Sequence, residues 1–348
     1  MQHTKNDLIQ MQSLPLSAKI LMTKRRIRDW YDYWNGEVFV SFSGGKDSTV
    51  LLHLAREVYS DIEAVFVNTG LEYPEIQKFV KTFDNVTILR PKMRFDEVIK
   101  KYGYPVISKD VAMTIHYAKQ NNAEWAWKRL NGISSKTDAP SEYIKTRYGK
   151  YKPLTQVDFN CSNWCCLVMK EKPLYEIEKI KKPITGILAS ESERRTVAWL
   201  KTGCNAFDSK KPMSKPMSFW MEQDVLQYIK ENNIPLASVY GDVIYKEDSD
   251  QIRMEDFGII GCGTDKLCTT GCDRTGCIFC AFGAHLDKQG GGKSRFERLK
   301  ETHPRQYAYC IGGGEYVNGV WQPSKEGLGM GHVSDELNEI YGNDFIKY

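Results

Sequence analysis

The sequence predicts an α/β protein with a doubly wound, mostly parallel sheet and a cysteine-rich C-terminal extension. Residues 37–55 have the pattern of an apolar strand, a glycine turn and a buried helix, and strands alternate with helical segments from there to about residue 90. The extension is indicated by the cysteines, because five of the ten fall between positions 262 and 280. The 348 residues, 41% of them hydrophobic, suffice for a full core.

Composition divides the chain into three predicted parts: a helical segment at 1–36, a nucleotide-binding domain at 37–250 and the cysteine-rich region at 251–348. The first part is basic and aromatic. Arg25, Arg26 and Arg28 could contact nucleic acid, with nearby aromatic side chains stacking on bases. The commoner arrangement packs the aromatic side chains against the neighbouring domain and leaves the charges in water.

The glycine turn carries the strongest chemical signal. Backbone N–H groups of such a turn, together with the start of the following helix, form a site for an anion. Glycine lets a phosphate or sulfate approach the backbone, serine hydroxyls and a lysine can bind it, and an aspartate can hold Mg²⁺ or orient a ligand. The turn consists of Ser43, Gly44, Gly45, Lys46, Asp47 and Ser48, and its spacing differs from that of a Walker A loop.

This turn resembles the signature of the PP-loop superfamily of adenine-nucleotide enzymes, and the chain resembles its phosphoadenosine phosphosulfate (PAPS) reductase branch. The resemblance implies a Rossmann-like PP-loop fold. It also implies that Thr69 and Gly70, after the second predicted strand, lie against the nucleotide. Lys46 and Asp47 are implied as catalytic residues of this loop.

A second element of the resemblance follows the predicted strand at 182–188. Gly186, Glu191 and Ser192 are in register with nucleotide-binding positions of the family, and Arg195 matches a position implied to act in catalysis. An arginine suits that place, since its planar fork can bind sulfate or phosphate through two hydrogen bonds. The same residues could also form a charged helix start with an i,i+4 ion pair.

The cysteines predict a metal centre, because a chain with no apolar signal region at its N-terminus is expected in the cytoplasm, where disulfides are rare. Cys165 and Cys166 resemble the cysteine pair of iron-sulfur adenylyl-sulfate reductases, and Cys277 and Cys280 supply a downstream C-x-x-C. The resemblance implies a 4Fe-4S cluster with these four ligands. Zn²⁺ is the alternative, bound by Cys268, Cys272, Cys277 and Cys280. Alternate metal ligands are Cys262, Cys268 and Cys272.

The resemblance implies one of two reactions in sulfur metabolism or sulfur transfer. In one, ATP adenylates an oxygen and a sulfur nucleophile then displaces AMP. In the other, a cysteine attacks the sulfur of adenylyl sulfate or its 3'-phospho form, and Cys310 is the candidate nucleophile. We expect a sulfur or electron donor protein as partner.

Two alternatives remain at this level. The same fold could thiolate tRNA or DNA with ATP, or the chain could be a nucleotide-sensing or partner-binding protein without catalysis. Binding to a membrane is not expected, because no run approaches about 18 apolar residues. The net charge of +4 suits an anionic ligand without indicating nucleic acid.

Overall fold

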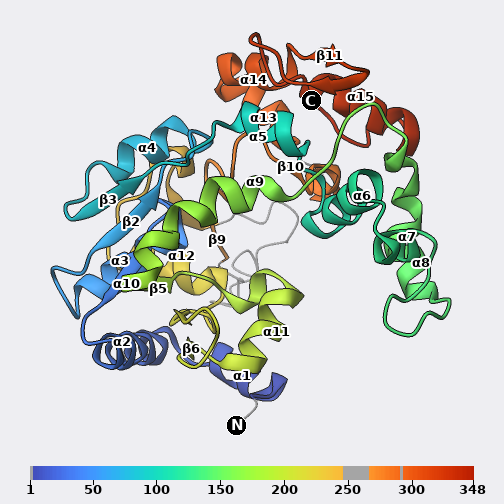
Figure 1. Cartoon of the computed structure of the whole chain (residues 1–348). Coiled ribbons are helices and arrows are strands. Elements are labelled where there is room, and N and C mark those ends of the chain that lie inside the picture. The colour runs from blue at the N-terminus through green and yellow to red at the C-terminus, as the bar shows by residue number, and fades with distance from the viewer. Residues whose placement is uncertain (1–2, 246–265, 291–292) are drawn as a thin grey trace, which may run out of the picture. The chain divides into compact units, whose positions relative to one another are not determined.

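The structure is a computed structural model that describes residues 3–245, 266–290 and 293–348 (Figure 1). It divides into two compact units, each assembled from separate stretches of the chain. The first unit comprises Met1–Asn68, Glu72–Leu89 and Leu174–Thr275, and the second comprises Thr69–Leu71, Arg90–Pro173 and Gly276–Tyr348. The predicted candidate ligand Cys262 lies outside the described residues.

A six-stranded sheet forms the centre of the first unit. Its strand order is β3-β2-β1-β5-β7-β6, and all neighbours are parallel except β6 and β7. The prediction of an α/β fold with a mostly parallel sheet is therefore confirmed. The strands are β1 (Val38–Ser41), β2 (Ala64–Val67), β3 (Val86–Leu89), β5 (Lys182–Thr185), β6 (Asn205–Ala206) and β7 (Met213–Ser214).

Helices cover this sheet because its central strands are apolar on both faces. Val38, Phe39 and Val40 of β1 are all buried, which is typical of a strand with helices on either side. The helices of the unit are α1 (Lys5–Gln12), α2 (Leu16–Tyr33), α3 (Lys46–Arg56), α4 (Pro74–Val80), α10 (Tyr175–Ile180), α11 (Glu193–Thr202) and α12 (Glu222–Glu231). Short β8 (Val243–Tyr245) pairs with β9 (Leu267–Thr269), and the 3-10 turns are η4 (Ala189–Glu191) and η5 (Ser238–Tyr240).

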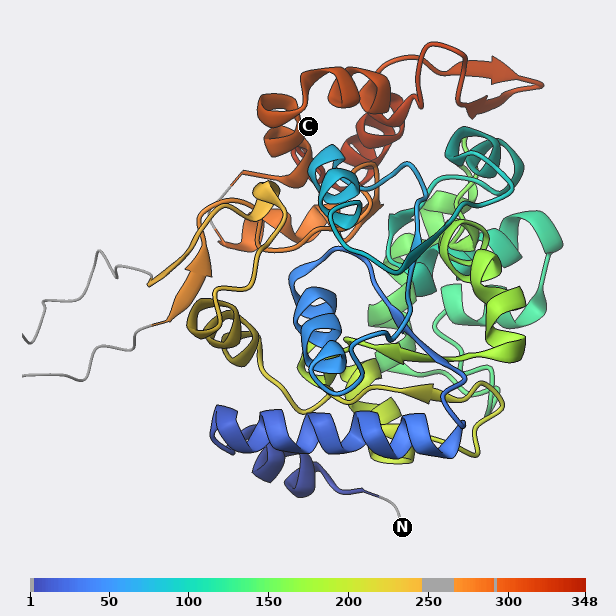
Figure 2. The ribbon, with the colours of Figure 1, turned by 90° about the vertical axis from the view of Figure 1, so that its left-hand side faces the viewer.

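The basic and aromatic segment near the N-terminus forms α2, the long blue helix in Figure 2, which packs against α3. Its Trp30 is fully buried in the core of the first unit. Arg25 Nε lies 2.8 Å from a carboxylate oxygen of Asp29 on the next turn, and Arg26 is within ion-pair distance of the same residue. The helix therefore uses its aromatic side chains for packing, as the commoner of the two sequence interpretations expects.

The second unit is mainly helical. Its helices are α5 (Phe95–Tyr102), α6 (Lys109–Asn121), α7 (Glu124–Leu130), α8 (Glu142–Tyr148), α9 (Trp164–Cys166), α13 (Arg295–Thr302), α14 (Pro304–Ile311) and α15 (Met330–Tyr341). Two small sheets complete it: β4 (Val106–Ile107) with β10 (Ala281–Phe282), and β11 (Glu315–Val317) with β12 (Val320–Gln322). Shorter helical turns are η1 (Gly149–Thr155), η2 (Leu167–Glu171), η3 (Lys172–Leu174) and η7 (Ala284–Gly290). Across the described residues of both units, helices long and apolar enough to span a bilayer are absent.

Candidate active site

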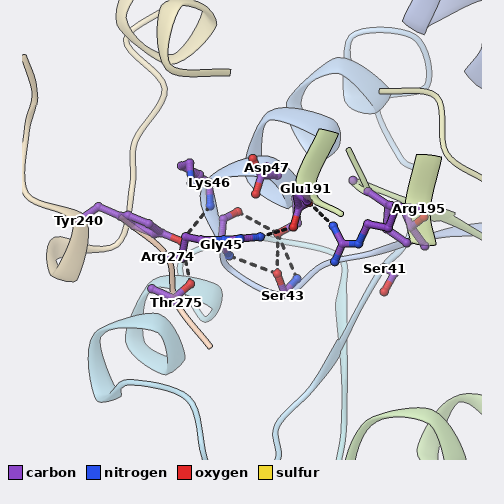
Figure 3. Close-up of a pocket in the computed structure, with 14 residues that line it drawn as sticks. Ser41, Ser43, Gly45, Lys46, Asp47, Glu191, Arg195, Tyr240, Arg274 and Thr275 are labelled. Carbon is purple, nitrogen blue, oxygen red and sulfur yellow. Dashed lines mark hydrogen bonds and ion pairs between the residues drawn. The ribbon is translucent and has the colours of Figure 1, made fainter. Parts of the chain in front are cut away.

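The first unit contains a cavity of about 330 Å³ where β1 and β5 end (Figure 3). Its floor is the glycine turn, which connects β1 to α3. The carboxyl ends of parallel strands are the usual place for a ligand in such a sheet. The residues that line the cavity are Ser41, Ser43, Gly45, Lys46, Asp47, Ser48, Thr185, Gly186, Ile187, Glu191, Arg195, Tyr240, Arg274 and Thr275.

Local hydrogen bonds fix the shape of the turn. The Ser48 hydroxyl accepts the backbone N–H of Ser43 at 3.2 Å, and it can donate to the carbonyl of Gly45 at 2.9 Å. Gly44 has a φ of +71°, and a Cβ there would lie 2.8 Å from a methyl of Ile76 on α4. Only glycine fits that position, since the backbone angle and the close approach of α4 both exclude a side chain.

Lys46 is buried at the first position of α3, with 4% of the residue exposed. Its ammonium donates to the carbonyl of Asp273 at 2.8 Å and pairs with Glu222 at 2.9 Å. Burial lowers the pKa of Lys46, but the negative charges of Asp47 and Glu222 outweigh it, and the pKa is raised overall. The side chain is therefore a permanent cation at the base of the cavity.

Two carboxylates of the cavity lie in contrasting surroundings. Burial raises the pKa of Asp47, and the charge of Lys46 opposes that rise without cancelling it. Glu191, at the end of η4, is paired through one oxygen with Arg195 and through the other with Arg274. Figure 3 shows its carboxylate between the two guanidinium groups. An anion that enters the cavity therefore meets three cationic side chains and two acidic ones.

The structure brings most of the predicted nucleotide-binding residues together. Ser43, Gly45, Lys46, Asp47, Ser48, Gly186, Glu191 and Arg195 line the cavity. Gly44 shapes the turn from behind, and the Ser192 hydroxyl caps α11 by accepting the backbone N–H of Arg195 at 3.4 Å. Thr69 and Gly70 belong to the second unit, where the Thr69 hydroxyl accepts the N–H of Leu71 at 3.1 Å.

Sequence reasoning missed Tyr240, Arg274 and Thr275. The buried Tyr240 hydroxyl accepts the backbone N–H of Lys46 at 3.2 Å and lies 2.7 Å from the Thr275 hydroxyl. Arg274 and Thr275 fall inside the cysteine-rich stretch, where the neighbouring cysteines indicate a metal site and not an anion site. Their one sequence signal is the polar Asp-Arg-Thr run between Cys272 and Gly276.

The second unit gathers the four predicted cluster ligands. Cys165 and Cys166 lie on α9, which continues into a π-helical turn at η2, and Cys280 donates its backbone N–H to the carbonyl of Cys277 at 3.1 Å. The pKa of Cys165 is raised by its hydrogen bond to Cys166, by burial, and by the charges of Cys166, Cys280 and Cys277. All four thiols therefore influence one another electrostatically.

Electrostatics favour a thiolate at Cys166. The hydrogen bond from Cys165 lowers the pKa of Cys166 most, and Lys109 and Lys170 lower it further against the effect of burial. Burial and the neighbouring Cys277 raise the pKa of Cys280 to about 11. A metal binds cysteines as thiolates, so these pKa shifts describe the free thiols alone.

Arg295, at the start of α13, holds the segment that carries Cys280. Its guanidinium donates to the carbonyls of Cys280 at 3.1 Å and Phe282 at 2.9 Å. It also makes a two-bond ion pair with Asp287, with both N–O distances 2.8 Å. Burial raises the pKa of Asp287, but these bonds to Arg295 outweigh it and lower the pKa overall. The backbone around Cys280 is thus fixed by a charged pair.

The chain was compared with known proteins. The model of the phosphoadenosine phosphosulfate reductase domain matches residues 37–281 of the 348, which is more than half of the chain. The chain belongs to the PAPS reductase family. The predicted family resemblance is therefore confirmed, and the matched range includes the glycine turn, both arginines of the cavity and the four clustered thiols.

Two kinds of curated relatives are similar to the chain. An adenosine 5'-phosphosulfate reductase of Staphylococcus haemolyticus is 24% identical over 216 residues, which cover 62% of this chain and 70% of the relative. An uncharacterised protein of Methanocaldococcus jannaschii is 42% identical over 76 residues, 20% of this chain. That match spans only 18% of the archaeal protein's length. A PAPS reductase from Candida auris, solved as a phosphate complex, covers 76% of this chain and 96% of its own at 14% identity, with a TM-score of 0.35.

Three other candidate cysteines of this PAPS reductase family chain lie among the described residues. Cys268 is on β9 of the first unit, and the Cys272 thiol donates to the carbonyl of Arg274 at 2.7 Å. Cys310, the predicted nucleophile, is fully buried on α14. Burial raises the pKa of Cys310, and the charge of Cys280 adds to the effect, which disfavours the thiolate that a nucleophile needs.

One further group of metal-ligating side chains occurs in the second unit. Donor atoms of Asp158, His332 and Glu336 lie within 4.8 Å of one another. The Asp158 carboxylate already accepts a hydrogen bond from the Tyr316 hydroxyl of β11, and its Oδ2 lies 2.9 Å from Nε2 of His332. We interpret the group as a polar link between the β11–β12 hairpin and α15.

Proposed function

We propose that the chain is a sulfonucleotide reductase-type enzyme that binds adenylyl sulfate, or its 3'-phospho form, together with a 4Fe-4S cluster. The observation that carries this proposal is the cavity at the glycine turn, which is lined by the serines of the turn, Lys46 and two arginines. Such a set suits the phosphate and sulfate groups of a sulfonucleotide. The similarity to adenosine 5'-phosphosulfate reductases supports the same substrate class.

Each residue of the cavity has a defined task in this proposal. The hydroxyls of Ser43 and Ser48, which lie 3.0 Å from each other in the ligand-free structure, exchange that contact for the phosphate. The ammonium of Lys46 exchanges its contact with Glu222 for the ligand. Arg195 holds the far anionic group, and Asp47 orients the ligand or a Mg²⁺ ion that accompanies it.

Four thiols of the second unit supply the ligand set that an iron-sulfur cluster requires. The pKa of Cys165 is raised by the charges of Cys166, Cys280 and Cys277, so these thiols act on one another electrostatically. A 4Fe-4S cluster supplies one-electron chemistry and positive charge when bound. Cys165, Cys166, Cys277 and Cys280 would hold it, and Lys109 and Arg295 would keep the ligands in place.

The reductase reaction requires a thiolate as nucleophile, and the four proposed cluster ligands and the buried Cys310 do not supply it. The thiolate attacks the sulfur of adenylyl sulfate, a sulfur–sulfur bond forms, and AMP leaves with the bridging oxygen. A donor protein with two thiols then releases sulfite and becomes oxidised to its disulfide. Because Cys310 is buried, this thiolate comes from the donor or from a cysteine outside the ligand set.

The burial of Cys310 also favours a second candidate, an ATP-dependent sulfur transfer. In that reaction an oxygen of the acceptor attacks the α-phosphorus of ATP and pyrophosphate leaves. A sulfur nucleophile then replaces the adenylated oxygen and AMP departs. The acceptor could be a small molecule, tRNA or DNA, and no cysteine nucleophile of this chain is needed.

Calorimetric titration of anaerobically purified protein separates these candidates. We expect adenylyl sulfate or its 3'-phospho form to bind more tightly than ATP, and Lys46→Ala to weaken that binding. Preference for ATP with Mg²⁺ would instead support the transfer reaction. If neither nucleotide class binds, the proposed function is wrong; binding without turnover in the presence of a dithiol donor would indicate a sensing protein.

Iron analysis tests the cluster separately. Cys277→Ser should lower the bound iron and acid-labile sulfide of the purified protein, because serine is a poor cluster ligand. Cys204→Ser is a matched control, since Cys204 is a buried cysteine of the first unit. A full cluster in the Cys277 variant would refute the ligand assignment.

A further inference from the structure

A short strap from the cysteine-rich region forms one wall of the nucleotide cavity. We define the strap as residues 271–275, all within the first unit. Its backbone is pinned to the turn at 239–242: Gly271 donates to the carbonyl of Tyr240 and Cys272 to that of Val239, both at 2.9 Å. A Cβ at Gly271 would lie 2.4 Å from the Val239 carbonyl oxygen, so the two backbones are in close contact.

The strap contacts the glycine turn directly. The carbonyl of Asp273 accepts a hydrogen bond from the Lys46 ammonium at 2.8 Å. The Thr275 hydroxyl lies 2.7 Å from the Tyr240 hydroxyl, which in turn accepts the backbone N–H of Lys46. The strap is therefore fixed by contacts to Lys46, a lysine that lines the cavity.

Between those two contacts the strap presents Arg274 to the cavity. Its guanidinium is paired with one oxygen of Glu191, while Arg195 is paired with the other oxygen. The Arg274 side chain is 64% exposed and that of Glu191 only 16% exposed. A guanidinium has five N–H donors, so each arginine keeps donors for a ligand while Glu191 holds it in place.

We propose that Arg274 and Arg195, held apart by Glu191, form a subsite for the tetrahedral oxyanion attached to the α-phosphate of the nucleotide. The subsite rests on the proposed function, since it requires a nucleotide in this cavity. Each guanidinium uses only part of its donors on Glu191, and the remaining donors suit a sulfate or a further phosphate. AMP lacks that group and would leave the subsite unused.

Calorimetry with three ligands tests the subsite. Arg274→Ala should weaken the binding of adenylyl sulfate and of ATP by about ten- to a hundredfold, which is typical for loss of charge-assisted hydrogen bonds, and should leave AMP binding unchanged. Arg274→Lys should recover only part of the loss, because an ammonium cannot make the two-bond contact. The ligand that loses more affinity identifies the group bound in the subsite. A larger loss for adenylyl sulfate indicates its sulfate, and a larger loss for ATP indicates its β- and γ-phosphates.

Arg194→Ala is the matched control, because Arg194 is an exposed arginine on α11 that does not line the cavity. It removes the same charge and should leave all three affinities unchanged. If Arg274→Ala binds adenylyl sulfate and ATP as tightly as the unmodified protein does, the subsite is wrong while the proposed function stands. If the substitution weakens AMP binding to the same extent, the subsite is also wrong, since Arg274 would then only support the fold. If the unmodified protein binds none of the three, the proposed function and the subsite both fall.

Discussion

Replacing Tyr240 by phenylalanine removes one hydroxyl that joins the glycine turn to the strap. That hydroxyl accepts the backbone N–H of Lys46 at 3.2 Å and lies 2.7 Å from the Thr275 hydroxyl. Tyr240 is 2% exposed, so water does not readily replace the lost group. The ring remains in Tyr240→Phe, and the packing of the core around it is therefore kept.

The expected cost follows from these two contacts. A buried N–H left without a partner costs about 1–3 kcal/mol, and the bond to Thr275 contributes about 1 kcal/mol. Because Lys46 and Tyr240 are both buried, we expect about 2–4 kcal/mol in total. The free energy of unfolding, measured by urea titration of the ligand-free protein, should fall by that amount. The affinity for the nucleotide should fall as well, since the first N–H of α3 and the strap are no longer held together.

Tyr228→Phe is the control for this prediction. The Tyr228 hydroxyl is within hydrogen-bond distance of His53 at 2.8 Å and of Glu57 at 3.0 Å, away from the cavity lining. Its loss should reduce stability and leave nucleotide affinity unchanged. A Tyr240→Phe protein with a stability loss below about 0.5 kcal/mol would refute the reasoning, because the hydroxyl would then satisfy no buried donor.

Three further substitutions test other parts of the structure. Gly186→Val should weaken nucleotide binding and cost about 1–3 kcal/mol of stability, since even a Cβ there lies 3.0 Å from the Asp47 carbonyl oxygen; wild-type affinity would contradict this contact. Arg295→Lys should lower the iron content, because the three donors of one ammonium cannot replace the four bonds that the guanidinium makes to Asp287 and two carbonyls. A full cluster in this variant would show that the support is dispensable. The ion pair of Asp287 with Arg295 stabilises the fold fully above the ordinary carboxyl pKa of 3.8, and this stabilisation is lost as pH falls through the lowered pKa of Asp287. The free energy of unfolding of Arg295→Lys should therefore fall less steeply at acid pH. Cys310→Ser should cost about 1–3 kcal/mol through burial of a hydroxyl and keep turnover, whereas a folded but inactive variant would identify Cys310 as the nucleophile.

The glycine turn could be predicted because its chemistry is contiguous. Six consecutive residues carry the backbone N–H groups, the hydroxyls and the cation, and the apolar residues on either side indicate the strand and the helix that position them. Gly186, Glu191 and Arg195 could be predicted for a similar reason, since they follow a recognisable strand. Parallel strands bring both segments to the same edge of the sheet, which is where the cavity lies.

The strap could not be predicted in the same way. Arg274 reaches the cavity only because the backbone at 271–272 pairs with the turn at 239–240, and those contacts join segments about thirty residues apart. No local pattern marks such a pairing. The division into two units was hidden for the same reason, because Thr69–Leu71 belong to the second unit while the residues on both sides of them in the chain belong to the first.

Residues 272–277 place two kinds of chemistry on one short piece of chain. Arg274 and Thr275 line the cavity, and Cys277, one of the proposed cluster ligands, follows after the single residue Gly276. If the proposed cluster forms, holding Cys277 in it restricts the residues next to it, so that a substitution of Cys277 can also change Arg274. In that case linkage requires that the nucleotide favours the cluster-bound chain to the same extent. A cysteine variant that weakens nucleotide binding is therefore no proof that its thiol contacts the nucleotide, and cluster content and affinity have to be measured on the same protein.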